Sequence, residues 1–358
     1  MGDRSLHVRH VNLARGFRGG ERQTLLLIEA LARLATHQGG IEQSLVCRRD
    51  SPIRDALGNL DIELIDADHA LAGHCHRSRA TLTHAHEAKA IHWAWVEKKL
   101  RGTPYILTRR VPQPVKPKHF NQVTYRDAAM SVAISSIIED HLRERNWCPV
   151  TKIPSVLSGQ PSDPVKVAAL RKRFAGCTVI GHIGALVDRH KGQRVLLDAA
   201  RQLRTTHPHV CFLLLGEGED GEALKEESAD LDNVIWEGFH PNVGDYLEIM
   251  TLFAFPSRNE GLGSTLLDAM DHSVPIVASD VDGIPDLVEN NVSGMLVPVD
   301  DAGALADTLQ ALLEDPTRQK RLAVSASQRL SAFTPGAMAN AYLALYQRLV
   351  DACQPANM

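Results

Sequence analysis

Two carboxylates stand eight positions apart in the stretch "RNEGLGSTLLDAM", at Glu260 and Asp268. Glu260 follows an apolar, strand-like segment, and Asp268 falls about one turn into an expected helix. Gly261 and Gly263 between them allow a ligand to come close to the backbone. Carboxylate oxygens accept hydrogen bonds from vicinal hydroxyls, so the pair indicates a site for a sugar and a ribose. Taken alone, Asp268 is equally explained by favourable placement near a helix dipole.

A second chemical pattern is "GALVDRHKGQRVLL" at residues 184–197, which follows one apolar segment and precedes an amphipathic one. Arg189 and Lys191 are expected near the N-terminus of the following helix. Unpaired N–H groups and the helix dipole favour an anion there, and two cations strengthen that preference. The pattern predicts a phosphate or diphosphate site, with a surface lysine beside a helix start as the alternative.

The N-terminal half carries three further candidates. Gly19 and Gly20 precede a helical stretch and suit an anion, a close substrate or a plain structural turn. His84 and His86 lie at the end of a strand and share one face of it. Such an HxH pair could bind a metal, but no third ligand has suitable spacing, so an active-site histidine is preferred and no metal is expected. The basic, proline-rich loop 108–118 could contact an anionic acceptor.

These residues must be positioned by alternating strands and helices. The apolar segments predict strands at 6–12, 44–47, 62–65, 81–86, 105–108 and 130–134, then at 177–184, 210–216, 233–236, 252–257, 275–279 and 294–299. Continuous apolar strands separated by amphipathic helices indicate parallel sheets covered on both faces. Two such runs predict an α/β protein with two doubly wound domains. The stretch 151–167 is the expected linker, and ligands are expected at the carboxyl ends of the strands.

Composition excludes several classes of protein. The chain has 358 residues, 44% of them hydrophobic and 23% charged, as in soluble globular proteins. It has no apolar run long enough for a membrane span and no evident signal peptide, and its six cysteines are scattered. We therefore expect a cytoplasmic protein with reduced thiols. Residues 1–156 are net basic (+7) and the remainder net acidic (−11). This asymmetry suits an anionic acceptor or peripheral contact with the inner membrane surface, and equally an ordinary solvated surface. Basic residues are not interleaved with aromatics, so no nucleic acid partner is expected.

The order of the motifs resembles the retaining glycosyltransferases of family 4, which have the GT-B fold. The resemblance runs from "GGERQTLLL" through "THAHEAKA", "GHIGALVDRHKGQRVLLDAARQL" and "LLLGEGED" to "PSRNEGLGSTLLDAMDHSVPIVASDVDGIPD". It implies two Rossmann-like domains that face each other across a cleft. The expected boundaries are 1–157 for the acceptor-binding domain and 158–334 for the nucleotide-sugar donor domain. Residues 335–358 are expected to form a helix that packs back on the first domain.

The resemblance also implies roles for single residues. His86, Lys191 and Glu260 would be catalytic, with Lys191 on the diphosphate and Glu260 on hydroxyls of the donor sugar. Asp268 would contact the ribose, and Phe239 would lie near the base. The other donor-binding positions are Gly19, Gly20, Arg189, Gly261, Leu262, Gly263, Ser264 and Thr265. The expected acceptor-binding residues are His84, Arg109 and Arg110.

Three departures from the family pattern concern the donor site. The second glutamate of the family's pair is here Asp268, one methylene shorter. The arginine often found after the glycine of the phosphate loop is here Ala185, and Arg189 is expected to compensate. The loop often written GGIPE is "DGIPD" at 282–286. Asp268 and Ala185 leave open a weakened donor site.

The sequence therefore predicts a retaining, metal-independent glycosyltransferase without a cofactor. Its donor would be a UDP-, GDP- or ADP-linked sugar, and its acceptor a glycan or glycolipid of the bacterial envelope, such as lipopolysaccharide. The alternatives are a catalytically weak nucleotide-sugar binding protein and a GT-B enzyme that acts on a small-molecule acceptor.

Overall fold

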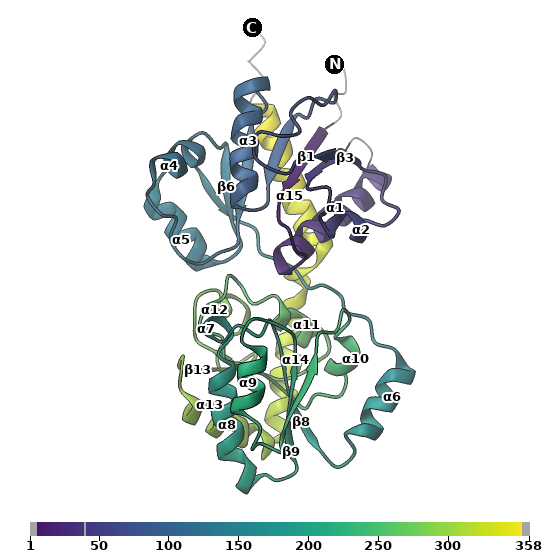
Figure 1. Ribbon diagram of the computed structural model, residues 1–358, viewed down its shortest axis with the longest axis vertical. Helices are drawn as coiled ribbons and strands as arrows, with labels where there is room; N and C mark the ends of the chain where they lie inside the picture. Colours follow the sequence, from purple (N-terminus) through teal and green to yellow (C-terminus); the bar gives the residue numbers. More distant parts are fainter. Residues whose placement is uncertain (1–5, 39–40, 353–358) are drawn as a thin grey trace. The chain divides into compact units, whose positions relative to one another are not determined.

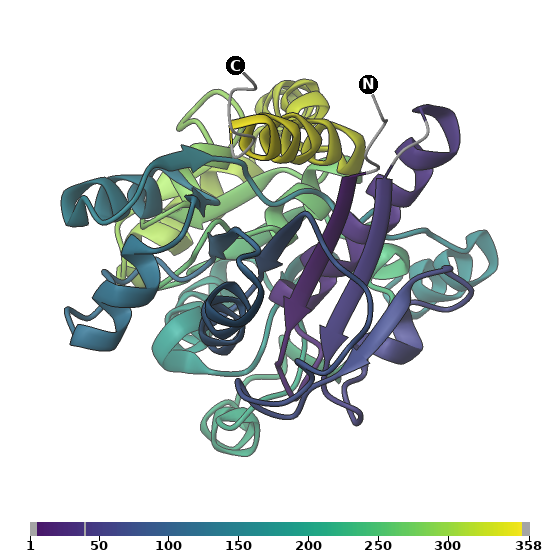
Figure 2. The same ribbon diagram turned by 90° about the horizontal axis from the view of Figure 1, so that it is seen from above.

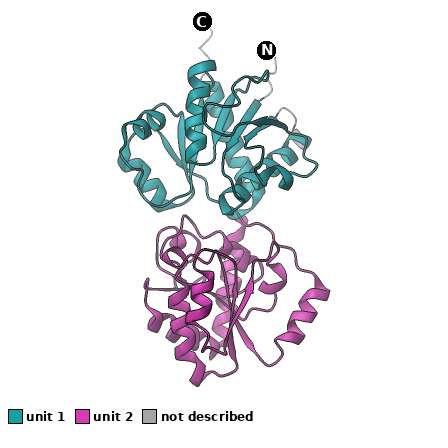
Figure 3. Ribbon diagram, in the orientation of Figure 1, with its two compact units in different colours: residues 1–156, 333–358 teal, residues 157–332 magenta. Residues whose placement is uncertain are grey.

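The computed structural model describes residues 6–38 and 41–352, and the chain forms two compact units (Figure 3). The first unit comprises residues 1–156 and 333–358, and the second comprises residues 157–332. The chain thus leaves the first unit once and returns to it with its last helix. That helix, α15 (Pro335–Ala352), packs against α1 (Gly19–Gln38), as Figures 1 and 2 let the reader follow.

Over the described residues, the first unit is built on a seven-stranded sheet in the order β3-β2-β1-β4-β5-β6-β7. All neighbouring strands are parallel. The strands are β1 (Leu6–Asn12), β2 (Ile41–Cys47), β3 (Glu63–Asp66), β4 (Leu82–Ala85), β5 (Tyr105–Arg109), β6 (Met130–Ala133) and β7 (Val150–Lys152). Besides α1 and α15, the helices are α2 (Ile53–Ala56), α3 (Ala88–Arg101), α4 (His119–Arg126) and α5 (Ser136–Arg145).

The second unit is built on a six-stranded parallel sheet in the order β10-β9-β8-β11-β12-β13. Its strands are β8 (Thr178–Ile183), β9 (Val210–Leu215), β10 (Val234–Gly238), β11 (Leu252–Phe255), β12 (Ile276–Ser279) and β13 (Met295–Val297). Its helices are α6 (Pro164–Arg173), α7 (Asp188–Lys191), α8 (Gln193–Thr206), α9 (Gly221–Glu227), α10 (Gly244–Leu247), α11 (Thr265–Asp271), α12 (Ile284–Leu287), α13 (Ala302–Leu313) and α14 (Pro316–Arg329). A 3₁₀ turn (Leu330–Phe333) precedes α15.

Each unit has its own hydrophobic core. In the first unit, Val8 of β1, Leu27 of α1 and Tyr342 of α15 are members of one buried cluster. In the second, every residue of β9 is buried, and α8 and α13 pack against each other beside the sheet. Strands buried on both faces read as continuous apolar runs, which is why the sequence pattern locates them well.

The strand order reverses once in each sheet, between β1 and β4 and between β8 and β11. The strands before each reversal are added toward one edge of the sheet, and the strands after it are added toward the opposite edge. Loops that leave the carboxyl ends of the two strands diverge at such a point and leave room for a ligand. The candidate residues of both units should therefore be sought at these two places.

The expected α/β architecture with two doubly wound parallel sheets is confirmed. Strand β7 was not predicted, because it has only three residues, none of them buried, and overlaps the stretch 151–167 that was interpreted as a linker. The short helix α7 was also not predicted, and it lies within the predicted phosphate loop. Within the described part of the chain, no helix is long and apolar enough to cross a membrane.

Candidate functional site

In the second unit, the two motifs with candidate chemistry come from neighbouring strands. The segment with Lys191 follows β8, and the segment with Glu260 follows β11. The two strands pair in parallel, with Leu252 opposite Ile180 and Phe253 opposite Gly181. Both segments therefore leave the same edge of the sheet at its point of strand reversal.

Lys191 and Glu260 form an ion pair at this edge. Their side chains are largely shielded, with 21% and 12% of their surfaces exposed. The Lys191 ammonium also lies 5.2 Å from the centre of the Phe255 ring, at the end of β11. The structure thus unites two residues that the sequence assigned to one site. A partly shielded cation beside a carboxylate can hold a diphosphate while the carboxylate accepts sugar hydroxyls.

The Glu260 segment is fastened to α7 by its backbone. The N–H groups of Arg258 and Asn259 donate to the carbonyl oxygen of His190, at 2.8 and 3.2 Å. The guanidinium of Arg258 bonds Asp188 at 2.8 Å and also pairs with Asp300. These contacts hold the two loops in register, so that Lys191 meets Glu260.

Asp188 is a positioning residue that the sequence analysis did not single out. Its carboxylate accepts the Arg194 N–H at 2.8 Å and the Arg194 guanidinium at 2.9 Å, as well as Arg258. Burial alone would raise the pKa of Asp188, but these hydrogen bonds outweigh it and lower the pKa. An ionised Asp188 therefore joins α7, α8 and the Glu260 loop. Sequence spacing does not predict its two basic partners, Arg194 and Arg258, because the fold brings them to Asp188.

The "DGIPD" loop supports Glu260 from the other side. One carboxylate oxygen of Asp282 accepts the Glu260 N–H at 3.0 Å and the Asn259 amide at 2.9 Å. The Gly283 N–H donates to the Glu260 carbonyl at 3.2 Å. A Cβ atom at Gly283 would lie 2.2 Å from the carbonyl oxygen of Gly261. This loop thus contacts the Glu260 backbone closely, with Asp282 as an acceptor that the departure from GGIPE supplies.

Asp268 has a different partner from Glu260. It lies in α11 with 7% of its surface exposed, and its two oxygens accept the Ser158 N–H at 2.8 Å and the Ser158 hydroxyl at 2.7 Å. Burial raises the pKa of Asp268, and the hydrogen bonds from Ser158 offset part of that rise. The carboxylate therefore holds the first residues of the second unit, and a ribose would have to share or replace this contact.

The remaining donor-site candidates are placed as follows. Phe239 follows β10 and is 64% exposed. Gly263 has a φ of +83°, which favours glycine, and Ser264 stands at the N-cap of α11 without a side-chain capping bond. Arg189 is exposed, pairs with Glu219 and donates from Nε to the His190 ring at 3.3 Å. The carbonyl of Ala185 accepts a hydrogen bond from Gln193, so this position supplies backbone only.

In the first unit, three buried histidines gather at the reversal between β1 and β4. They are His10, His84 and His86, and their ligand nitrogens lie within 4.8 Å of one another. His84 bonds the hydroxyls of Tyr346 and Thr108, each at 2.7 Å. Both His84 nitrogens are therefore engaged by the protein, and an acceptor could bind His84 only by displacing one of these hydroxyls.

His86 sits directly after β4 and is almost fully buried. Its Nε2 lies 3.0 Å from His10 Nδ1, and its backbone N–H donates to the Val11 carbonyl. Its Nδ1 has no hydrogen-bond partner among the described residues. Burial, reinforced by His84, His10 and Arg110, holds the pKa of His86 well below its ordinary value. His86 is therefore neutral at physiological pH.

The glycines at the start of α1 adjoin Arg110. A Cβ atom on Gly20 would lie 3.6 Å from the Arg110 side chain, and nothing lies within 4 Å of one on Gly19. Arg110 also donates to the Ser155 hydroxyl at 3.3 Å, while its Nε is buried and without a partner among the described residues. Arg109 instead donates to the Gln113 carbonyl at 2.6 Å. The structure therefore brings Arg110, but not Arg109, to the first turn of α1.

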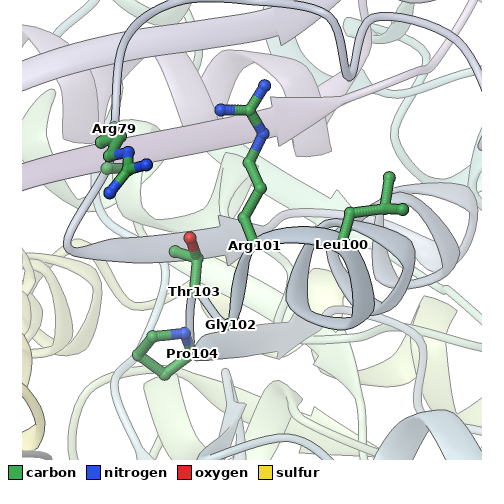
Figure 4. Close-up of a pocket in the computed structure, with 7 residues that line it drawn as sticks. Arg79, Leu100, Arg101, Gly102, Thr103 and Pro104 are labelled. Carbon is green, nitrogen blue, oxygen red and sulfur yellow. The ribbon is translucent and has the colours of Figure 1, made fainter.

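A surface hollow of about 410 Å³ lies elsewhere on the first unit (Figure 4). Arg79 and Ala80, which precede β4, line it together with residues 100–104, from the end of α3 to the start of β5. These are the amino ends of the strands, whereas His86 follows a carboxyl end. The hollow is therefore separate from the candidate site.

The chain is similar to several known proteins. Residues 177–315 match the model of the family described as Glycosyl transferases group 1. The chain is 28% identical over 237 residues to the alpha-D-kanosaminyltransferase of Streptomyces kanamyceticus, covering 63% of this chain and 61% of that protein. It is 31% identical over 198 residues to the lipopolysaccharide core biosynthesis mannosyltransferase LpsB of Rhizobium meliloti, covering 50% and 52%. The matched stretches thus span about three fifths and about half of these relatives.

Among solved structures, Anabaena Alr3699/HepE in complex with UDP and glucose is similar to the chain with a TM-score of 0.80. The identity is 20%, and the likeness covers 96% of this chain and 100% of that one. It extends over both units and therefore confirms the expected GT-B fold. The chain thus has the GT-B fold, and its residues 177–315 are similar to the family Glycosyl transferases group 1.

Proposed function

We propose that this chain is a glycosyltransferase that moves a sugar from a nucleoside diphosphate sugar to an acceptor hydroxyl, with retention of the anomeric configuration. The observation that carries the proposal is the ion pair of Lys191 and Glu260 at the strand reversal of the second unit. It combines a cation for phosphate with a carboxylate for sugar hydroxyls, on loops fixed by Asp188 and Asp282. The family match over residues 177–315 supports the same interpretation.

The chemistry follows from charge. Departure of the nucleoside diphosphate leaves positive charge on the sugar and negative charge on the phosphate. Lys191, with help from Arg189, would stabilise the departing diphosphate by electrostatic attraction, which lets the reaction proceed without a metal. Glu260 would exchange its contact with Lys191 for sugar hydroxyls. Retention is proposed to follow from attack on the face that the diphosphate leaves, with the phosphate taking the acceptor proton.

The rest of the donor is assigned to the loop and helix around α11. The backbone from Gly261 to Thr265 is proposed to contact the sugar and phosphate, and Phe239 to stack on the base. Asp268 is proposed to reach the ribose through its Ser158 partner or through water. UDP, GDP and ADP donors are all compatible with these contacts, and the complex of Alr3699/HepE with UDP favours testing UDP sugars first.

The first unit is proposed to bind the acceptor. Its basic residues, among them Arg109 and Arg110, suit an anionic glycan or glycolipid, and the similarity to LpsB supports an envelope glycan. Gly19 and Gly20 are proposed to lie under phosphate, and His86 to contact a sugar hydroxyl. A location in the cytoplasm, with contact at the inner membrane surface, would give the protein access to such acceptors.

A weak nucleotide-sugar binding protein is the second candidate, favoured by one observation: Asp268 is already satisfied by Ser158. The deciding experiment incubates the chain with UDP-, GDP- and ADP-sugars, with and without lipopolysaccharide core and small sugar acceptors. Acceptor-dependent release of one nucleoside diphosphate, with an α-linked product from an α-linked donor, supports the proposal. A rise in Tm with one donor but no transfer to any acceptor would assign the chain to the binding proteins.

A further inference from the structure

The interior of the first unit contains a hydrogen-bonded network of three side chains that the proposed function does not explain. Gln43 of β2 bonds His10 of β1, and His10 bonds His86 at the end of β4. The distances are 3.1 Å from His10 Nε2 to Gln43 Oε1 and 3.0 Å from His10 Nδ1 to His86 Nε2. The network therefore runs from the Gln43 side-chain amide of β2 to His86, the candidate histidine.

Gln43 determines which atom donates and which accepts in every hydrogen bond of the network. Its amide nitrogen donates to the carbonyl oxygen of Ile28 at 3.1 Å, so its Oε1 is an acceptor. His10 must then donate from Nε2, which leaves His10 Nδ1 as the acceptor of a neutral ring. His86 must in turn donate from Nε2. The proton of a neutral His86 is therefore on Nε2, and Nδ1 carries a lone pair.

The surroundings keep both rings neutral. Burial lowers the pKa of His10 to about 4 and holds the pKa of His86 well below its ordinary value. The charged or titratable groups that face His86 are His10, His84 and Arg110, and none of them would stabilise a protonated His86. A carboxylate is missing from this set, so His86 has no counter-ion within it.

The three histidines could by spacing alone hold a metal ion, but their hydrogen bonds argue for another use. Both ring nitrogens of His84 form hydrogen bonds, to Tyr346 and Thr108. Both ring nitrogens of His10 also form hydrogen bonds, to Gln43 and His86. Among these nitrogens, only Nδ1 of His86 has no partner within the described residues. One unpaired lone pair in a buried place suits a single hydrogen-bond donor.

We propose that Gln43 and His10 are positioning residues that lock His86 in its Nε2–H form, so that Nδ1 accepts a hydrogen bond from a substrate hydroxyl. The assigned ligand at His86 is thus a neutral hydroxyl donor and not a phosphate, because a lone pair repels an anion. This inference rests on the proposed function for the identity of the hydroxyl as one of a sugar. The tautomer itself depends only on the geometry of the first unit.

The tautomer can be read directly by ¹⁵N NMR of the histidine-labelled chain. The unliganded protein should show His86 Nδ1 in the unprotonated range and Nε2 in the protonated range, from neutral pH to mild alkali. Gln43→Leu should shift both signals toward values averaged between the two tautomers. Gln43→Glu, which keeps an oxygen acceptor for His10, should restore the original pattern. A His86 that is protonated on Nδ1, or signals that Gln43→Leu leaves unchanged, would overturn the proposal.

Kinetics then separate positioning from stability. Ser44→Ala is the matched control, because the Ser44 hydroxyl also bonds a β1 histidine, His7, at 2.9 Å but does not contact His86. Gln43→Leu should lower kcat roughly tenfold more than Ser44→Ala at a similar loss of Tm, and Gln43→Glu should recover most of it. Equal kcat for Gln43→Leu and Ser44→Ala would contradict a role in transfer. If the wild-type chain transfers no sugar, the proposed function fails, while the NMR arm still decides the tautomer.

Discussion

At the scale of single residues, Lys191 is the cation to which we assign the donor diphosphate. Its ammonium is shielded, paired with Glu260 and close to the Phe255 ring, so it is held in place before a ligand arrives. A preorganised charge stabilises a leaving group without reorganisation at the moment of reaction.

Lys191→Ala is therefore expected to lower kcat for sugar transfer by roughly 100-fold or more. The same variant should weaken binding of the free nucleoside diphosphate, measured by isothermal titration calorimetry. Lys225→Ala is the matched control, since Lys225 is an exposed lysine of the same unit that pairs only with Glu222 among the ion pairs described. Comparable activity in the two variants would remove Lys191 from the mechanism.

Asp268 makes a separate prediction about stability. Its replacement by alanine removes two hydrogen bonds to Ser158 and should cost roughly 2 kcal/mol of unfolding free energy. The double variant with Ser158→Ala should be less destabilised than the sum of the single variants, by about 1 kcal/mol, because one bond is counted twice. Urea unfolding measures all three, and Asp271→Ala on the same helix controls for loss of an exposed carboxylate. Strict additivity would mean that the Ser158 hydroxyl is not coupled to Asp268.

Residue chemistry was only partly predictable from sequence. The motif assigned Lys191 and Glu260 to one site, and the structure places them in contact. The supports of that contact, Asp188 and Asp282, were not found, because each bonds partners whose approach depends on the tertiary fold. His84 was interpreted as an acceptor contact, but its bond to Tyr346 crosses 262 positions and has no local signal.

At the scale of elements, the site depends on close approaches between loops that only glycine permits. Gly192, between α7 and α8, has a φ of +66°, and a Cβ there would lie 2.0 Å from the carbonyl oxygen of Pro256. That carbonyl belongs to the segment that carries Glu260. The Glu260 loop thus approaches Gly192 so closely that a single methyl group there would clash with it.

Gly192→Ala should therefore destabilise the chain and displace the Glu260 loop. Gly176→Ala provides the comparison, because Gly176 also has a positive φ, +87°, but nothing lies within 4 Å of a Cβ there. The backbone cost of roughly 1 kcal/mol is common to both variants, so any excess in Gly192→Ala measures the clash. We expect an excess of at least about 1 kcal/mol by thermal unfolding, together with weaker donor binding. Equal unfolding free energies would show that the loops separate without strain.

Strands β1 and β4 give a pH-dependent stability through His10. Burial lowers the pKa of His10 to about 4 from an ordinary value of 6.5. Between these values the unfolded chain binds a proton that the folded chain rejects, so this contribution is complete above pH 6.5 and declines as the pH falls toward 4. It amounts to at most about 3 kcal/mol.

The wild-type chain should thus lose more unfolding free energy than His10→Gln when urea titrations are moved from pH 7 to about pH 4.5. His119→Gln, which removes an exposed histidine of α4, should follow the wild type. Parallel pH curves for wild type and His10→Gln would contradict the buried, neutral state of His10.

Elements were more predictable than contacts, for a physical reason. The long buried strands β1 and β9 are apolar runs, and a short apolar run bounded by turn residues is typical of a buried strand. Strand β7 has three residues, none of them buried, and α7 has four residues, so neither is long enough for a periodic pattern. Short elements of this kind are set by their neighbours in the fold.

At the scale of the whole molecule, two similar sheets carry different chemistry at equivalent places. The reversal in the second unit presents the Lys191 and Glu260 pair, and that in the first presents neutral His86. The excess of basic residues in the first part of the sequence and of acidic residues in the remainder parallels this division. In the proposed function, a few placed residues supply the charge for a donor diphosphate, whereas basic residues spread over the first unit supply the charge for an acceptor.

Sugar transfer at this site is tested most directly by acceptor-dependent nucleoside diphosphate release, measured for wild type, Lys191→Ala and Lys225→Ala on the same donor panel. Wild type and Lys225→Ala should release one nucleoside diphosphate for each sugar transferred. Lys191→Ala should do so at least roughly 100 times more slowly. Release that needs no acceptor, or that survives the loss of Lys191, would contradict the claim that this site transfers sugars.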